Sequence, residues 1–378
     1  MNIFNRLTEN FTKVQPLPAG VHHLQAMQDE KPYRLHLRLN KDGSGLLILN
    51  AATVLQLNST AAEYAFHFVK GTEPEEAAKQ ISKRYRVDKA AALADFQTFA
   101  EQIQELISTP DLDPVSFLNF ERAAPHSAGT TLRLDCALTY RLPEDTQAQY
   151  APVKRVDREL STDEWKLIMD KAWAAGVPHI IFTGGEATLR DDLMMLIDHA
   201  EKNGQVCGLL TDGIKLTDKD YLEMLLQTGL DHVMVILQPN DPRSWKAIET
   251  IVPADLFLTV HLTLTKENVN DAKDILKKLA HLGVENISLS AAESDLLDEL
   301  LALQDVAGSL NLTLRWDLPV PYSAANPIGI ETVDEEIPAG AGKAWLYVEP
   351  DGDVLPAQGE PDKVMGNLLR DEWENIVK

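Results

Sequence analysis

The stretch HIIFTGGEATLRDDLMMLIDHAEKNGQVCGLL, residues 179–210, decides the fold. It opens with a short apolar run, passes through paired glycines into a helical pattern that ends in Gly204, and closes with a second apolar run. Continuous apolar runs are typical of strands buried on both faces, and a glycine after a helical pattern is typical of a helix end. The stretch therefore predicts a strand–helix–strand unit with parallel strands and a right-handed crossover.

The same alternation continues on both sides of this stretch, from residue 131 to residue 318. About six such units make an α/β domain, which is either an open doubly wound sheet or a partial barrel. We predict a partial (βα)6 TIM-like barrel. Its expected strands are LRLDCAL, HIIF, VCGLL, HVMVIL, FLTVHLTL, NISLS and LTLRW.

The chain before the barrel has the pattern of a separate small domain. Residues 17–110 start with the strand-like runs GVHHLQAM, YRLHLRLN and GLLILNAA, and three helical patterns follow, the second opening with a capping box at Thr72 and Glu75. Strands followed by helices predict a winged-helix-like α+β domain. Residues 1–16 are expected to be a polar tail and residues 111–130 a linker rich in Pro, Ser and Gly. Residues 319–378 differ in composition and form a last region.

Composition and charge limit the classes of partner. The chain has 378 residues and a formal net charge of −23, which repels a phosphate backbone, so we expect no nucleic acid partner. No apolar run is long enough to cross a membrane, and the first residues have no apolar core of the signal-peptide kind. We therefore expect a cytoplasmic protein with no membrane contact.

Polar residues follow two consecutive barrel strands and mark a candidate pocket. Gly184, Gly185 and Glu186 come after the first, and Thr211, Asp212 and Gly213 come after the next. Ligands of parallel α/β folds bind at the carboxyl ends of strands, where paired glycines allow close approach to the backbone. The structural alternative is a Gly-Gly turn in which Glu186 caps a helix.

Three parts of the chain carry resemblances to known families. The barrel segment at residues 159–216 resembles the core of radical S-adenosylmethionine (radical SAM) enzymes, whose Gly-Gly-Glu-Pro and Thr-Asn-Gly motifs read Gly-Gly-Glu-Ala187 and Thr-Asp212-Gly here. VLQLNSTAAEYA, residues 54–65, resembles the turn of PqqD-like domains that bind the leaders of ribosomally made peptides. Residues 347–376 are similar to the SPASM/twitch-like tail of peptide-modifying members.

The radical SAM resemblance implies cluster-binding cysteines that this chain lacks. Where the family has three cysteines that hold a 4Fe–4S cluster, this chain has Leu142, Thr146 and Gln149, and none of them offers a thiolate. The auxiliary-cluster positions of the tail are Ser323 and Ala357. We therefore expect no cluster, no metal site and no bound S-adenosylmethionine, so that the pocket residues 184–186 and 211–213 would be vestigial.

The remaining cysteines and histidines have ordinary structural interpretations. Cys136 and Cys207 lie in apolar strands, as buried thiols do. His179, His232 and His261 each lie on a barrel strand and could make a site if their side chains pointed inward, but structural core histidines are the preferred interpretation.

These expectations combine into a first hypothesis of a catalytically inactive homologue with no catalytic residues. It would bind a precursor peptide as a chaperone or scaffold, in complex with a cluster-bearing radical SAM paralogue. The peptide would add as a strand beside YRLHLRL and contact one helix face. The expected peptide-binding residues are Tyr33, Leu35, Leu37, Phe96, Phe99 and Ile103, for which domain core is an equal alternative.

Two other functions stay open at this point. The barrel could be an enzyme that uses Glu186, Asp212 or Asp135 as acid or base, since crowded carboxylates raise one another's pKa. The chain could instead be a purely structural, oligomerising partner.

Overall fold

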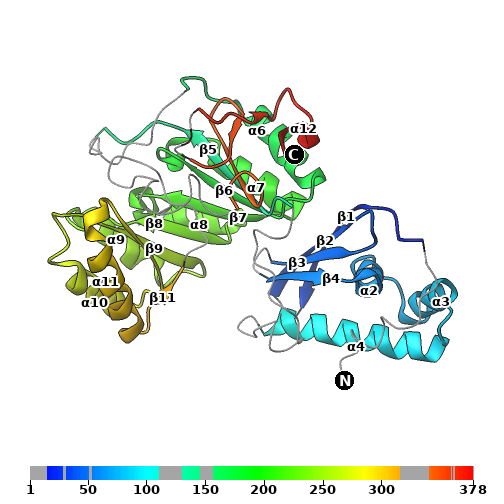
Figure 1. Ribbon diagram of the computed structural model, residues 1–378. Coiled ribbons are helices and arrows are strands. Elements are labelled where there is room, and N and C mark those ends of the chain that lie inside the picture. Colours follow the sequence, from blue (N-terminus) through cyan, green and yellow to red (C-terminus); the bar gives the residue numbers. More distant parts are fainter. Residues whose placement is uncertain are drawn as a thin grey trace. The chain divides into compact units, whose positions relative to one another are not determined.

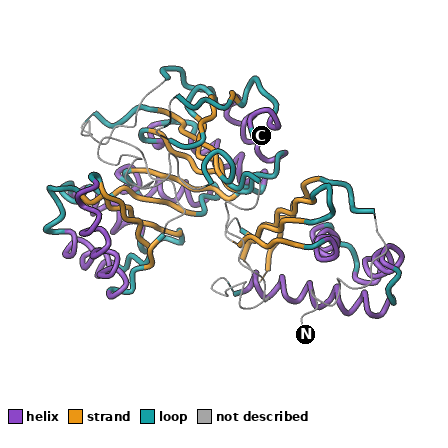
Figure 2. The backbone as a smooth tube through the Cα atoms, viewed as in Figure 1, coloured by secondary structure: helices purple, strands orange, loops and turns teal. Residues whose placement is uncertain are grey.

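The computed structural model describes residues 15–28, 31–50, 53–109, 130–144, 156–315, 340–358, 360 and 362–377. The chain divides into two compact units (Figure 1). The first comprises Met1–Leu132 with Ala174–Pro178, and the second comprises Arg133–Trp173 with His179–Lys378. Both contain helices and strands (Figure 2).

The first unit is a four-stranded antiparallel sheet with three helices after it. The strand order is β1-β2-β3-β4, so β2 and β3 are interior and β1 and β4 are the edges. The fourth strand follows the three expected from the sequence. The elements are β1 Gly20–Gln28, β2 Lys31–Leu39, β3 Gly45–Leu49, β4 Thr53–Leu57, α2 Ser59–Val69, α3 Pro74–Tyr85 and α4 Lys89–Ser108.

Local chemistry explains where these helices begin. The Asn58 side chain accepts a hydrogen bond from the Ala61 N–H at the start of α2, and Asp88 does the same for the Ala90 N–H at the start of α4. Helix α3 begins at Pro74, a residue well suited to the first helical position. The predicted capping box at Thr72 is therefore wrong.

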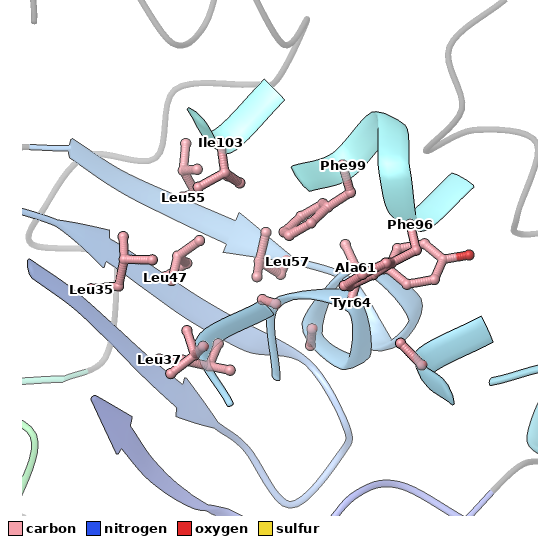
Figure 3. Packing of buried hydrophobic residues seen from close by; sticks show 14 of the residues in the cluster. Leu35, Leu37, Leu47, Leu55, Leu57, Ala61, Tyr64, Phe96, Phe99 and Ile103 are labelled. Carbon is pink, nitrogen blue, oxygen red and sulfur yellow. The ribbon is translucent and has the colours of Figure 1, made fainter. Parts of the chain in front are cut away.

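The core of the first unit lies between its sheet and its helices. Alternate leucines of β2, β3 and β4 point to one face, as the pleat of a strand requires, and they meet the apolar face of α4 (Figure 3). Tyr64 of α2 joins them, with its ring centroid 6.2 Å from that of Phe96. The unit therefore has a hydrophobic core of its own.

The second unit is built on one ten-stranded sheet. Strands β5 to β11 lie side by side in parallel, as the strand–helix repeats predict. The strands are β5 Arg133–Thr139, β6 His179–Gly184, β7 Val206–Thr211, β8 His232–Ile236, β9 Phe257–Leu264, β10 Asn286–Ala291, β11 Thr313–Leu314, β12 Trp345–Val348, β13 Asp353–Leu355 and β14 Gly366–Asn367.

Helices alternate with these strands, and contacts with the helices distinguish the two faces of the sheet. The helices are α6 Thr162–Ala174, α7 Leu193–Asn203, α8 Lys219–Gln227, α9 Pro242–Ile251, α10 Ala272–Leu282, α11 Leu297–Ser309 and α12 Trp373–Ile376. The Cys207 thiol lies 3.9 Å from the Ile197 carbonyl of α7, so Cys207 faces a helix. Its neighbour Gly208 therefore faces the opposite side, which we call the inner face. Cross-strand register assigns Asp135, Ile181, Met234 and Thr259 to the same inner face.

The tail continues the sheet beyond β5. Strand β12 pairs with β5 in parallel, from Trp345 opposite Arg133 to Val348 opposite Cys136, and β13 and β14 follow in antiparallel. The sequence had set residues 319–378 apart as a separate region, whereas the described strands of this tail belong to the same sheet. No helix in the described part of the chain is long and apolar enough to span a membrane.

Candidate functional site

The candidate pocket begins where β6 ends in paired glycines. The Gly185 N–H donates to the Thr139 carbonyl at 2.6 Å, and the Glu186 N–H donates to the Arg141 carbonyl at 2.8 Å. A Cβ on Gly184 would lie 2.1 Å from the Thr139 oxygen, and one on Gly185 would lie 2.2 Å from the Arg141 oxygen. The glycines are thus needed because the chain's own backbone comes this close after β5.

Glu186 is the centre of the pocket's hydrogen bonds. Its side chain is buried, and Oε1 accepts hydrogen bonds from the Thr188 N–H at 2.9 Å and from the hydroxyls of Thr188 and Thr211 at 2.6 and 2.8 Å. Oε2 accepts the Asp212 N–H at 2.8 Å. Glu186 thereby caps a short 3₁₀ helix, Ala187–Leu189, as the structural alternative predicts, and it also ties the end of β6 to the end of β7.

Asp212 is the titratable group of this pocket. Burial, together with the neighbouring Glu186 carboxylate, raises the pKa of Asp212 to about 7. Its Oδ1 accepts the Ile214 N–H at 2.8 Å, which holds the side chain beside Glu186. The pocket thus contains a carboxyl group that can bind and release a proton near neutral pH.

An ionic network borders the Gly-Gly-Glu turn. Arg190 is bidentate to Asp192, with its Nη2 at 2.7 Å from Oδ2, and its Nη1 lies 3.7 Å from Glu159. The Thr139 hydroxyl donates to Glu159, which also accepts from Arg141 Nε at 3.2 Å. These contacts hold the chain after β5 and the turn after β6 in one arrangement.

The inner face of the sheet is more polar than the sequence suggested. The buried hydroxyls of Thr183 and Thr259 have no hydrogen-bond partner among the described residues. His261 lies on the same face, where its Nδ1 is 3.0 Å from the Ser288 hydroxyl and its Nε2 is 3.1 Å from the hydroxyls of Thr263 and Ser290. A buried hydroxyl without a partner is costly, so these two threonines are suited to a polar ligand. The signal in the sequence was the alternation of polar residues along β9, at Thr259, His261 and Thr263, and along β10, at Ser288 and Ser290.

The predicted cluster positions are only partly placed. Leu142 is described and offers no ligand atom, while Thr146, Gln149 and Ser323 lie outside the described residues. Ala357 is buried. Cys136 and Cys207 are both buried thiols that form no disulfide, and burial raises the pKa of the Cys136 thiol.

The predicted peptide-binding residues belong to the core of the first unit. Figure 3 shows Leu35, Leu37, Phe96, Phe99 and Ile103, which are all buried in this core. Tyr33 is partly buried and packs against it. Burial of these five side chains agrees with the domain-core alternative, while a role in peptide binding stays a prediction. The predicted binding edge YRLHLRL is β2, which pairs with β1 on one side and β3 on the other. It therefore offers no free edge.

Comparison with known proteins shows what the second unit is similar to. Residues 136–290 match the radical SAM superfamily. The chain is 26% identical to the PqqA peptide cyclase of Bradyrhizobium diazoefficiens over 272 residues, which are 63% of this chain and 70% of that protein. It is 29% identical to the PqqA peptide cyclase of Streptomyces rochei over 248 residues, 58% and 67% of the two chains.

Solved structures share the fold over most of the chain. Streptococcus suis SuiB bound to the precursor peptide SuiA aligns with a TM-score of 0.62 at 14% identity, covering 94% of this chain and 89% of that one. SuiB bound to S-adenosylmethionine aligns with a TM-score of 0.60 at 16% identity, covering 91% and 87%. The predicted α/β fold with a mostly parallel sheet is confirmed. The PqqD-like and SPASM/twitch-like assignments stay predictions.

The comparisons overturn three expectations drawn from the missing cysteines. The first hypothesis favoured a catalytically inactive homologue over an enzyme, and it expected no cofactors. The relatives are named as peptide cyclases, and a structural neighbour is described with bound S-adenosylmethionine, so the family points to an enzyme with cofactors.

The residues present do not fit every group that the family implies. A cluster held by three thiolates needs more cysteines than the two in this sequence, and both of these are buried within strands. No reaction step is therefore assigned through a cluster held by this chain alone. The polar inner face and the turns after β6 and β7 remain suited to a polar ligand. The chain is thus similar to the radical SAM superfamily over residues 136–290.

Proposed function

We propose that this protein is an enzyme of peptide modification that acts on a ribosomally made precursor peptide. The observation that carries the proposal is the combination of a radical SAM barrel with a small antiparallel unit that has free sheet edges. The names of the relatives, PqqA peptide cyclases, support a peptide as substrate, as does the described complex of SuiB with its precursor peptide.

In this proposal the first unit is a PqqD-like domain, residues 17–110, that holds the leader of the peptide. The leader adds as a strand to the edge of β4, where unpaired backbone groups supply hydrogen bonds. Three features favour β4. It has no strand on its outer side among the described residues, it leads into α2 through the turn that resembles PqqD-like domains, and its Leu55 and Leu57 pack in the same cluster as α4. Helix α4 would then lie beside the added strand.

The barrel receives the segment of the peptide that is modified. Thr183 and Thr259 supply unpaired buried hydroxyls on the inner face, and Asp212 supplies a carboxyl group with a pKa of about 7 at the ends of the strands. Together they make a polar, titratable lining, which a polar peptide backbone needs if it is to be bound away from water.

A cluster-bearing paralogue is proposed as the partner protein. The two cysteines of this chain motivate this step, because a second chain could bring the thiolates that this one lacks. The cytoplasmic location, the domain limits at residues 111–130 and 319–378, and the SPASM/twitch-like nature of the tail stay predictions.

The test is anaerobic native purification of the tagged chain from its source cells, with mass spectrometry of proteins and short peptides. Recovery of a leader-bearing peptide is the expected result, and recovery of a cluster protein would support the partner. The recovered peptide is then added to the pure chain, and hydrogen exchange is followed. Protection of amides in Thr53–Leu57, with β1 unchanged, is expected. A chain that never binds the peptide from its own cells would overturn the proposal.

A further inference from the structure

Two histidines meet on the inner face, at the end of the sheet opposite to the Gly-Gly-Glu turn. His179 is the first residue of β6 and His232 is the first residue of β8. Their Nε2 atoms are 2.7 Å apart, and their ring centroids are 4.9 Å apart. Strand β7 separates the two strands, so both side chains must reach across it to meet.

A glycine in β7 makes this meeting possible. Gly208 lies opposite His232 in the sheet, and a Cβ on Gly208 would be 2.1 Å from the His232 Cε1 atom. Glycine inside a strand weakens it and often marks a place where another group comes close to the backbone. Here the group is the imidazole of His232, which lies directly over the strand.

We propose that His179 and His232 bind a divalent transition-metal ion, such as Zn²⁺, through their Nε2 atoms. Imidazole nitrogen is a preferred ligand of zinc, nickel and copper ions. Two imidazoles whose Nε2 atoms face each other need one shared proton in the absence of metal, and the ion takes the place of that proton.

The geometry needs only a small adjustment. Zinc–nitrogen bonds of about 2.0–2.1 Å with a tetrahedral angle place two ligand nitrogens about 3.3 Å apart. The rings start at 2.7 Å, and both are only partly buried by their neighbours, so a slight opening admits the ion and leaves room for water ligands.

The surrounding charges also permit a cation. Burial lowers the pKa of His232 to about 4 and lowers that of His179, so both imidazoles are neutral near pH 7, which is the form that binds metal. Arg133 acts against a cation, but Asp135 pairs with it at 2.7 Å, and Asp231 adds a negative charge next to His232. The two histidines lie at the starts of their strands, whereas Asp212 follows the end of β7.

The test uses the full chain, stripped with a chelator and titrated with Zn²⁺ by calorimetry and with Co²⁺ by absorption spectroscopy. Wild type is expected to bind one ion per chain at this site and to melt at a higher temperature with zinc. His179→Ala and His232→Ala are expected to lose this binding. Gly208→Ala, which removes no ligand, is expected to weaken binding at least tenfold by displacing the His232 ring.

A matched control comes from the first unit. His23 and His36 also touch, with their Nδ1 atoms 3.0 Å apart, so zinc could bind there instead. His36→Ala is expected to keep the ion bound at His179 and His232. Equal uptake by wild type, His179→Ala and His232→Ala, each shown to be folded by circular dichroism, would overturn the proposal. Loss of the ion in Gly208→Ala with retained fold supports it even if a histidine variant fails to fold.

Discussion

Asp212 couples the candidate pocket to pH. In the folded chain its pKa is about 7, against an ordinary value of 3.8. Between these values the folded state keeps a proton that the unfolded state has released, so stability falls as pH rises from about 4 towards 7 and is lowest above 7. Asp212→Asn keeps the acceptor for the Ile214 N–H but removes the titration.

We therefore expect Asp212→Asn to be more stable than wild type above pH 7, by about 1–3 kcal/mol, and to lose the fall in stability between about pH 4 and pH 7. Urea unfolding at several pH values measures this. Asp218→Asn is a control, because that carboxylate caps α8 at the surface and its loss should cost stability at all these pH values. Parallel pH curves for wild type and Asp212→Asn would contradict the assignment.

A substitution at Thr183 tests whether this side chain serves ligand binding or the stability of the fold. Its buried hydroxyl has no partner among the described residues, so Thr183→Val removes a polar atom but no hydrogen bond. We expect unchanged or higher stability, by up to about 1–2 kcal/mol, together with weaker binding of the recovered peptide. Thr211→Val is the matched control.

The Thr211 hydroxyl donates to Glu186 at 2.8 Å and accepts the Gly213 N–H at 3.0 Å, so its loss is expected to destabilise the fold. Thermal melting of both variants separates the two cases. If Thr183→Val destabilises as much as Thr211→Val, the hydroxyl of Thr183 has a structural partner and the argument for a ligand fails.

At the scale of elements, the close approach of the chain after β5 to the end of β6 depends on glycine. Gly185→Ala would bring its Cβ within 2.2 Å of a backbone oxygen, which cannot move as a side chain does. We expect a loss of more than about 2 kcal/mol in unfolding free energy. Gly308→Ala in α11 meets nothing within 4 Å and should instead gain up to about 1 kcal/mol through helix propensity. Denaturant unfolding of both variants makes the comparison, and a neutral Gly185→Ala would contradict the geometry.

The sequence predicted the elements whose signals are local. The strands from β5 to β10 are short runs rich in apolar residues, and helical patterns lie between them, so the strand–helix order could be predicted. The pairing of β12 with β5 was not readable, because it joins residues about 210 positions apart and rests on no local pattern. The prediction of a capping box at Thr72 was wrong because α3 begins at Pro74, which is well suited to the first helical position.

The candidate site was readable only in part for the same reason. The sequence alone identifies Gly185, Glu186 and Asp212 as candidate site residues, because they follow apolar strands at the carboxyl edge of a parallel sheet. The contact of His179 with His232 depends on register across β7, which no single strand reveals. Peptide binding and domain core were equal alternatives for Phe99 and Ile103. Both side chains are buried in the core of the first unit, as is usual for an apolar helix face that packs against a sheet.

At the scale of the whole molecule, the two units have different roles in the proposed enzyme. The first has its own core and free sheet edges, and the second has a polar inner face with titratable groups at its strand ends. A peptide held by its leader is present at a high effective concentration for the barrel, so weak contacts in the barrel suffice. Because the first unit has its own core, it is also expected to unfold independently of the second unit.

We expect residues 1–132 expressed alone to fold. A domain with one core and about 90 described residues is large enough to be stable without the rest of the chain. Circular dichroism and thermal melting should show one cooperative transition, and the fragment should bind the recovered leader as the full chain does.

Phe99→Ala in the fragment is expected to lower the free energy of unfolding by about 3–5 kcal/mol, enough to unfold it, because Phe99 is 2% exposed within that core. Met27→Ala, whose side chain is 63% exposed, should leave the transition unchanged. A fragment without a cooperative transition would mean that the first unit depends on the barrel for its fold.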